Sequence, residues 1–483
     1  MHGSVGHSIY TKSVVDLVNI IHSKSPQKDS LFEQAEQFFL HYQEDKAQLR
    51  NLKTEFEKAE SSFNTATKKT TELLRKKFNR AKQAYREEKT RQQDLRLKRL
   101  GQVLEVCAKL IRLSEGSDWD KTQVNSAKML GTLQMVCPTE GVRVREEKQR
   151  FKPAYKAVIS MRLLDKLLAD KQVNLQYLQA RYVEAERYSA EGEGLTSFHE
   201  EIAIPIIIAA IFQDVGLLHP EAQRILKGED GQRDEFALLE KVARVTLLKV
   251  NHKHTLEYIV HGLGVELYVG DSKEARTEFN LKQEQRMKLL QALLMGALQP
   301  KLGLGNLIKV PQIYTSFIFS SKPKQSLADL PKAGLVIANA AKQSAISKVA
   351  ADSLLAIVGH FPQGFGITYV PLEVDGSFSD SYEFAIVTGL NPSDPFEPIC
   401  RVATRNLTFI GNGQVKIIDV DSNLYFPEPK KMLEKIDPER LKLILKKLVS
   451  NFEERKDLDL IPSHWDPYGF FEYKDLQNLW KKT

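Results

Sequence analysis

The residues of this chain that could do metal chemistry begin with a polar pair at the end of an apolar run. The stretch IIIAAIFQDVGLLHP, from Ile206 to Pro220, ends its apolar part at Gln213 and Asp214. This pair could be the remnant of a metal site or a helix terminus that meets water. A lone carboxylate with no paired acid, base or metal lacks the partners that catalysis at a metal-type site needs. We therefore expect Asp214 to cap the turn that follows.

Histidines near this pair could also serve as ligands. His252 and His254 are two residues apart, so on a helix they point about 200° away from each other. With His261 they are expected at the surface or at the edge of the core. His199 and His219 flank the buried helix, and ligation by either is the less favoured alternative. The sequence predicts no metal site and no cofactor.

Composition places these residues in an ordinary folded protein. The chain has 483 residues, of which 42% are hydrophobic and 27% charged, and this length suits two to four domains. Its three cysteines have no CxxC spacing, which argues against a disulfide framework and a zinc knuckle. We find no signal peptide, and the apolar run from Ile202 to Phe212 is shorter than the roughly 20 residues that span a bilayer. A cytoplasmic protein without a membrane span is expected.

The net charge of +7 arises from one segment. Between Tyr42 and Leu100 there are 17 Lys and Arg against 9 Asp and Glu. Exposed aromatic residues are not interleaved with these charges, as they are in single-strand binders. We therefore interpret the segment as a solvated helical face and do not expect a nucleic-acid polymer as partner.

The same segment is predicted to be one long helical region, from residue 31 to 113. It contains no proline and is rich in good helix formers. Apolar residues follow coiled-coil spacing, first at Leu49, Leu52, Phe56, Ala59, Phe63 and Ala66, and then, shifted by one place, at Leu74, Phe78, Ala81 and Tyr85. A hairpin within one chain and a self-associating dimeric coil both fit this pattern.

The expected fold class is mainly α, with a small antiparallel β subdomain near the C-terminus. We predict a helical module over 1–190, an all-helical domain over 198–360, a β subdomain over 361–425 and a helical tail over 429–483. Expected helices cover 155–188, 200–212, 234–250, 281–298 and 344–358. Asn412-Gly413 lies between apolar runs and predicts a two-residue β-hairpin, and the aromatic tail from His464 is expected to pack onto the body.

Two stretches resemble the HD-GYP family of bacterial cyclic di-GMP phosphodiesterases. AAIFQDVGLL stands where that family reads AALLHDIGK, and FPQGFGITYV…EFAIVTGLNPSDPFEPICRV is similar to its tail, YPVGSxVxL…AVVxxxNPxxPxxPxV. The tail is the more specific match, with Phe361-Pro362, Gly364, Asn391-Pro392, Pro395 and Pro398 in the family's order. The resemblance covers residues 198–405, under half of the chain.

The resemblance implies a metal-dependent site whose ligands are largely lost. Gln213 replaces the motif histidine and Leu217 the lysine, whereas Asp214 persists. The family's HHExxDGxGYP has only scattered counterparts, VNHKH at 250–254, His261 and KLGLGN at 301–306. Its VADVYDALTSxRPY is represented by KVPQIYTSFIFSSKPK, in which the acids are replaced by Pro311 or Gln312 and by Thr315 or Ser316. We expect no catalytic residues, and treat Gln213 and Asp214 as vestigial.

A cyclic dinucleotide would then have to bind without metals. Its two phosphates need positive donors and its bases need a stacking surface. The candidates are Arg244, Lys301, Lys309, Lys322 and Lys324, with Tyr314 for stacking. The alternative is that these lysines are solvated on a helix surface.

The leading hypothesis is therefore a bacterial signalling protein with a degenerate HD-GYP-type domain that regulates by binding cyclic di-GMP or a protein. One alternative is a weakly active metal-dependent phosphodiesterase with a rearranged site. The other is a scaffold protein whose coiled coil is the functional part.

Overall fold

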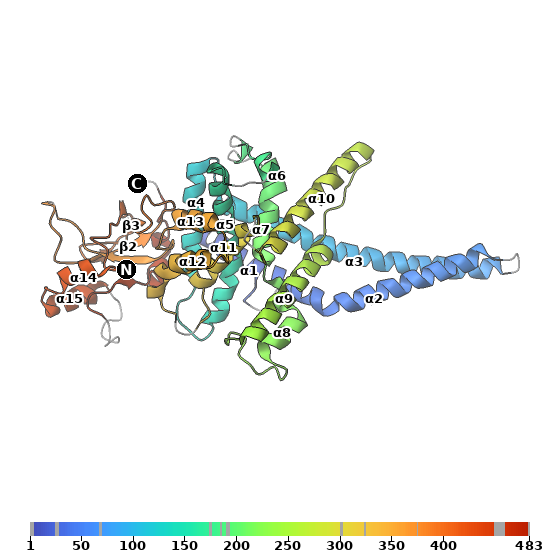
Figure 1. Ribbon diagram of the computed structural model, residues 1–483, viewed down its shortest axis with the longest axis horizontal. Coiled ribbons are helices and arrows are strands. Elements are labelled where there is room, and N and C mark those ends of the chain that lie inside the picture. The colour runs from blue at the N-terminus through green and yellow to red at the C-terminus, as the bar shows by residue number, and fades with distance from the viewer. Residues whose placement is uncertain are drawn as a thin grey trace. The chain divides into compact units, whose positions relative to one another are not determined.

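The computed structural model describes residues 4–24, 29–66, 70–172, 176–183, 186–189, 194–299, 303–322, 325–373, 375–448 and 459–481. These residues are mainly helical, with a small antiparallel sheet toward the C-terminus (Figure 1), so the predicted fold class is confirmed. The chain divides into two compact units that are interleaved in sequence. The first unit is residues 1–24, 107–211 and 292–483, and the second is residues 25–106 and 212–291. This division does not follow the contiguous domains predicted from sequence.

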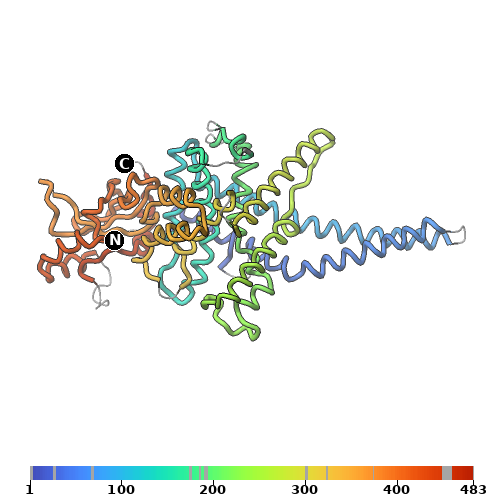
Figure 2. The backbone as a smooth tube through the Cα atoms, in the orientation of Figure 1, coloured from blue at the N-terminus to red at the C-terminus, as the bar shows by residue number. Residues whose placement is uncertain are grey.

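The predicted long helical region is an antiparallel pair, α2 (Leu31–Asn64) and α3 (Thr71–Ser114), whose arms lie side by side (Figure 2). Helix α2 begins with a capping box in which Ser30 and Glu33 bond each other's backbone N–H. In the seam, the Phe78 ring packs against Phe56 and Phe63, with centroids 5.8 and 5.4 Å apart. Since these contacts join the two helices of one chain, the seam forms an intramolecular hairpin.

The second unit also contains η3 (Val215–Leu218), α8 (Pro220–Lys227), α9 (Lys241–Glu257), the π-helix η4 (Tyr258–Leu263) and most of α10 (Lys273–Gly296). Helix α9 was expected to start at Asp234. It starts later because the Asp234 carboxylate and carbonyl accept hydrogen bonds from the N–H groups of Phe236 and Ala237, which form a turn.

Helix α5 (Val144–Ala169) is the centre of the helical part of the first unit and is buried along most of its length. It packs against α1 (Ile9–Ile21), α4 (Trp119–Val136), α11 (Asn306–Ile318) and α13 (Lys348–Val358). The helix predicted over 155–188 is wrong beyond Ala169, because Lys171 adopts a positive φ of 55° and only the four-residue α6 (Gln176–Gln179) follows. The remaining helical elements there are η2 (His199–Ala203), α7 (Ile204–Phe212), η6 (Leu327–Lys332) and α12 (Ala333–Lys342).

The sheet of the first unit has five antiparallel strands in the order β6-β3-β2-β1-β7. These are β1 (Gly366–Tyr369), β2 (Glu383–Val387), β3 (Ile399–Val402), β6 (Val415–Ile417) and β7 (His464–Trp465). The C-terminal tail supplies β7, and the Trp465 indole donates to the Ala385 carbonyl. The tail therefore packs onto the sheet, as predicted. The short helices α14 (Pro427–Leu433), α15 (Pro438–Leu448), α16 (Tyr468–Phe471) and η8 (Lys474–Leu476) complete this part, and buried residues of α14, α15 and α16 share a core with the sheet.

The hairpin predicted at Asn412-Gly413 is wrong. The two-residue turn lies at Asn406-Leu407, both with positive φ, and joins β4 (Thr404–Arg405) to β5 (Thr408–Phe409). At Gly413 the chain instead passes so close to β3 that a Cβ would lie 1.7 Å from the Val402 carbonyl oxygen. The glycine marks a close backbone approach, and β6 pairs with β3.

One helical run among the described residues is long and apolar enough to cross a membrane. It is His199–Leu218, with a mean hydropathy of 1.9, and 78% of its most apolar window is buried inside the protein. The core helix of a soluble protein has the same properties, so this run does not establish a membrane span. Its first turns are π-helical, ending before Pro205, which has no N–H to donate.

Candidate functional site

The Gln213-Asp214 pair lies at the end of α7, where the second unit begins, and its backbone is bonded to α9. The Gln213 carbonyl accepts hydrogen bonds from the Asn251 amide (3.3 Å) and the Thr255 hydroxyl (3.4 Å). The Thr255 hydroxyl also accepts from the Gly216 N–H at 3.1 Å. A Cβ at Gly216 would lie 2.1 Å from the Asn251 carbonyl oxygen, so only glycine allows this approach. Neutral polar groups therefore hold the motif against α9.

Asp214 occupies the N-cap position of η3, as expected, but its side chain makes no capping hydrogen bond there. The backbone supplies the turn instead, because the Asp214 carbonyl accepts from the Leu217 N–H at 3.1 Å. The prediction that the carboxylate caps the turn is therefore wrong for the side chain. Gln213 is buried and Asp214 half-buried.

In the same stretch of α9, between Asn251 and Thr255, His254 meets a second histidine. His219, the N-cap residue of α8, stacks on His254 with ring centroids 3.3 Å apart and an interplanar angle of 7°. His254 Nε2 lies 2.8 Å from Glu221 Oε2, and His254 Nδ1 lies 2.9 Å from Glu257 Oε2. One ligand atom each from His219, His254 and Glu257 lies within 4.8 Å of the others. These residues form what we call the histidine–glutamate cluster: His219, Glu221, His254 and Glu257.

The electrostatics of the cluster favour a neutral His219. Burial, followed by the charge of His254, lowers the pKa of His219 to about 4. Its Nδ1 accepts a hydrogen bond from the Glu221 N–H at 3.1 Å, which also requires a lone pair on that nitrogen. The hydrogen bond with His254 lowers the pKa of Glu221. The cluster thus holds a neutral imidazole and an ionised carboxylate near neutral pH.

Sequence reasoning missed this cluster for two reasons. His252 and His254 do point apart, and His252 is outside the cluster, but His254 faces His219, which is 35 positions earlier in the chain. The two glutamates were not considered as partners at all. The usable signal was the i, i+3 pair His254 and Glu257, which a helix places on one face.

His199 lies in a different setting, a buried ion network in the first unit. Its Nδ1 accepts from the Thr196 N–H at 3.0 Å, so Nε2 carries the proton and donates to Glu115 at 2.9 Å. Glu115 also accepts two hydrogen bonds from the Arg187 guanidinium, at 2.7 and 2.9 Å. With both ring nitrogens used in this way, His199 is a hydrogen-bonding residue of the core.

Two residues of α5 complete the network. Arg187 donates to both carboxylate oxygens of Asp165, at 2.8 and 3.1 Å, and Arg162 donates to Glu115 at 2.6 Å. Burial alone raises the pKa of Glu115, but the charges of Arg187 and Arg162 outweigh it and hold this pKa well below its usual value. We call Glu115, Arg162, Asp165, Arg187 and His199 the buried ion network.

Among the described residues, the candidates for binding a cyclic dinucleotide do not form one site in either unit. Tyr314 is 2% exposed and stacks on Tyr155 in the core of the first unit, so it offers no face to a base. The Lys309 ammonium donates to Gln312 at 3.0 Å, and Lys322 is exposed. Arg244 is exposed on α9 in the second unit. Lys301 and Lys324 lie outside the described residues.

The later vestigial motif lies on α11. Pro311 and Thr315 are buried, Gln312 is half-buried and Ser316 is exposed. These four positions of the first unit therefore do not present a common polar face to solvent.

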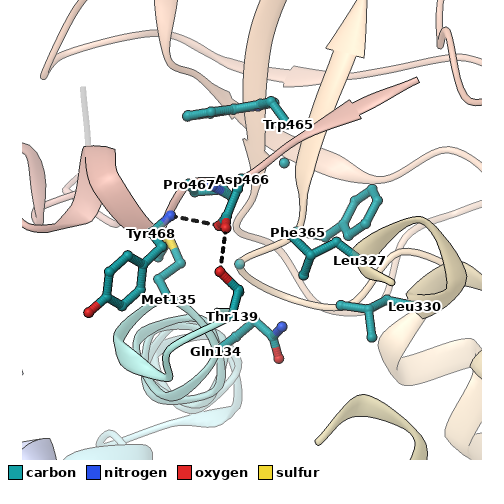
Figure 3. Close-up of a pocket in the computed structure, with 12 residues that line it drawn as sticks. Gln134, Met135, Thr139, Leu327, Leu330, Phe365, Trp465, Asp466, Pro467 and Tyr468 are labelled. Atoms are coloured by element: carbon teal, nitrogen blue, oxygen red, sulfur yellow. Dashed lines mark hydrogen bonds between the residues drawn. The ribbon is translucent and has the colours of Figure 1, made fainter. Parts of the chain in front are cut away.

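A small pocket lies between the end of α4 and the C-terminal tail of the first unit (Figure 3). The Thr139 hydroxyl donates to Asp466 at 2.6 Å, and the Tyr468 N–H donates to the other carboxylate oxygen at 3.0 Å. Met135, Leu327 and Leu330 contribute apolar walls. None of the described residues predicted to bind ligand lines this pocket.

Comparison with protein-family models, curated proteins and solved structures finds no significant match to this chain.

Proposed function

We propose that this chain is a signalling protein with a degenerate HD-GYP-type domain, and that it regulates by binding a partner protein without hydrolysing cyclic di-GMP. The main support for the proposal is that the backbone of the Gln213-Asp214 motif is hydrogen-bonded to α9 and packed closely against it. Asn251 and Thr255 bond the motif backbone, and the Gly216 backbone lies against the Asn251 carbonyl. Hydrolysis of a phosphodiester requires metal-bound water and charge compensation at such a motif.

The donor residues near the motif support the same conclusion. Gln213 offers an amide in place of an imidazole, and amides are weak ligands for the metals of this chemistry. The histidine–glutamate cluster does not include Asp214. A hydrolytic site that used Asp214 would therefore need ligands beyond this cluster.

Protein binding is favoured over dinucleotide binding by the positions of the candidate contacts. Tyr314 stacks in the core, so it is not presented to a ligand, and the Lys309 ammonium already donates to Gln312. In the α2–α3 hairpin the apolar residues of the two helices pack against each other, and the charged outer faces stay exposed. Such a hairpin can present a rigid surface to another protein without first dissociating.

The test is a hydrolysis assay on the full chain with cyclic di-GMP and added manganese or iron, beside the variant Asp214→Ala. The proposal predicts no turnover in either protein. Turnover by the original chain that disappears in Asp214→Ala would overturn it, provided that both proteins have the same circular dichroism spectrum. Calorimetry with cyclic di-GMP then distinguishes a protein partner from the dinucleotide. A regulator that binds only a protein gives no saturable heat when cyclic di-GMP is added.

A further inference from the structure

The histidine–glutamate cluster contains a hydrogen-bonding conflict that a cation would remove. Both nitrogens of His254 face carboxylate oxygens, Glu221 across 2.8 Å and Glu257 across 2.9 Å. A neutral imidazole carries one proton and can donate to only one of them. If Nε2 donates to Glu221, the lone pair of Nδ1 points at the Glu257 carboxylate. Either a second proton on His254 or a cation bound at Nδ1 and the Glu257 carboxylate removes this conflict.

The residues around this contact are metal ligands by type. Imidazole nitrogens and a carboxylate oxygen form the donor set of zinc and the neighbouring first-row divalent metals. His219 contributes a second imidazole, whose Nδ1 lone pair would have to exchange the hydrogen bond from the Glu221 N–H at 3.1 Å for the ion. Three protein ligands with a fourth position for water is a common arrangement for zinc.

The distances suit a single ion. Metal–nitrogen and metal–oxygen bonds of about 2.0–2.1 Å place adjacent ligand atoms roughly 3 Å apart. The Nδ1 to Oε2 distance of 2.9 Å between His254 and Glu257 already has this value. All three ligand atoms lie within 4.8 Å of one another, and because the two imidazoles stack nearly parallel, the His219 ring must turn out of the stack to join the same coordination sphere.

The surroundings hold the ligands in place. Phe39 of α2, 4% exposed, packs edge-on against both rings, with centroids 5.4 Å from His219 and 6.1 Å from His254. Glu221 accepts from the second nitrogen of His254, which is how metal-binding histidines are usually oriented. His254 is itself buried, whereas Glu221 is partly exposed and leaves the site open to an entering ion.

We propose that His219, His254 and Glu257 bind one zinc-class divalent ion, with Glu221 as the carboxylate that orients His254. The site lies wholly within the second unit and ties α8 to α9. Neither Asp214 nor hydrolysis is involved, so this inference stands or falls independently of the proposed function.

The test is zinc calorimetry on the full chain after removal of metals with a chelator, supported by cobalt absorption spectra. Zinc should bind with one site per chain. Glu221→Gln removes a residue that only orients a ligand, so it should weaken zinc binding by roughly 10- to 100-fold. His254→Gln and Glu257→Gln each remove a ligand and should weaken zinc binding by more than that. His252→Gln, on the same helix but outside the cluster, is the matched control and should bind as the original chain does.

Circular dichroism must show that the compared proteins are folded, and Glu257→Gln provides a second loss variant if His254→Gln does not fold. The proposal is overturned if the folded, metal-free chain shows no saturable zinc binding, in which case His254 is bridged by a proton alone. It is equally overturned if Glu257→Gln and His254→Gln bind zinc as tightly as His252→Gln does, because the ion would then lie elsewhere.

Discussion

Replacing Arg187 by methionine should sharply destabilise the first unit. The Arg187 side chain is fully buried and donates hydrogen bonds to both Glu115 and Asp165. Its loss would leave two buried carboxylates with Arg162 as their remaining cation in the buried ion network. Removing one partner of a buried ion pair typically costs about 3–5 kcal/mol, mainly because the remaining charge is uncompensated. We expect a cost in this range for Arg187→Met.

The chain offers a matched control in Arg181, which lies in the same connecting segment. Arg181 pairs with Glu201 at 2.8 Å, but the two side chains are 29% and 20% exposed. Pairs with access to water contribute about 0–1 kcal/mol, so Arg181→Met should change stability by no more than that. The difference between the two variants isolates the effect of burial.

The pH dependence provides a second check. The folded-state pKa of Glu115 is held well below its usual value of 4.5. A depressed carboxyl pKa contributes stability that is fully present above the unfolded-state value and is lost as the pH falls through the folded-state value. The gap in stability between the original chain and Arg187→Met should therefore be full at neutral pH and narrow only in acid, below about pH 4.

Hydrogen exchange with peptide resolution, combined with urea unfolding, would measure both effects in the first unit. Arg187→Met should accelerate exchange in peptides of α5 and lower the midpoint of unfolding. Equal losses for Arg187→Met and Arg181→Met, or a loss of under about 0.5 kcal/mol for the former, would refute the reasoning.

Two further predictions concern the hairpin and the ligand. Phe78→Ala removes a half-buried ring that packs on both Phe56 and Phe63, so the hairpin should lose about 2–4 kcal/mol of stability, seen as faster exchange in α2 and α3. The exposed Leu73 is the control, and equal effects of Leu73→Ala would contradict the seam. Calorimetry should show no binding of cyclic di-GMP to the original chain. Binding that weakens with added salt and is lost in the double variant Lys309→Glu, Lys322→Glu would restore the dinucleotide hypothesis.

The sequence predicted best where local patterns repeat. The seam from Leu49 to Tyr85 was found because a three-and-four spacing reports directly on which residues face a partner helix. The spacing could not distinguish helix pairing within one chain from pairing between two chains, because both bury the same positions. The ring contacts of Phe78 with Phe56 and Phe63 make that distinction.

Prediction failed where a residue type has several uses. Asn412-Gly413 predicted a hairpin, but Gly413 is required by the close passage of the Val402 carbonyl, and the turn is formed at Asn406-Leu407. Likewise, Tyr314 and Lys309 suited a nucleotide by chemistry alone. Burial against Tyr155 determines that Tyr314 is a core residue, and burial by distant parts of the chain is not visible in a local pattern.

The candidate site shows the same limit. The vestigial Gln213-Asp214 motif could be located from sequence, but its attachment to Asn251 and Thr255 could not. The cluster of His219 with His254 depends on how η3 and α8 return against α9. No spacing rule connects residues that meet only through this packing.

The most direct test of the central claim is cyclic di-GMP turnover measured together with metal content in one preparation, for the original chain and Asp214→Ala. We expect one metal ion per chain, unchanged in Asp214→Ala, and no turnover by either protein. Two ions per chain, with turnover that Asp214→Ala abolishes, would show that the motif is a working hydrolytic centre and would contradict the proposed function.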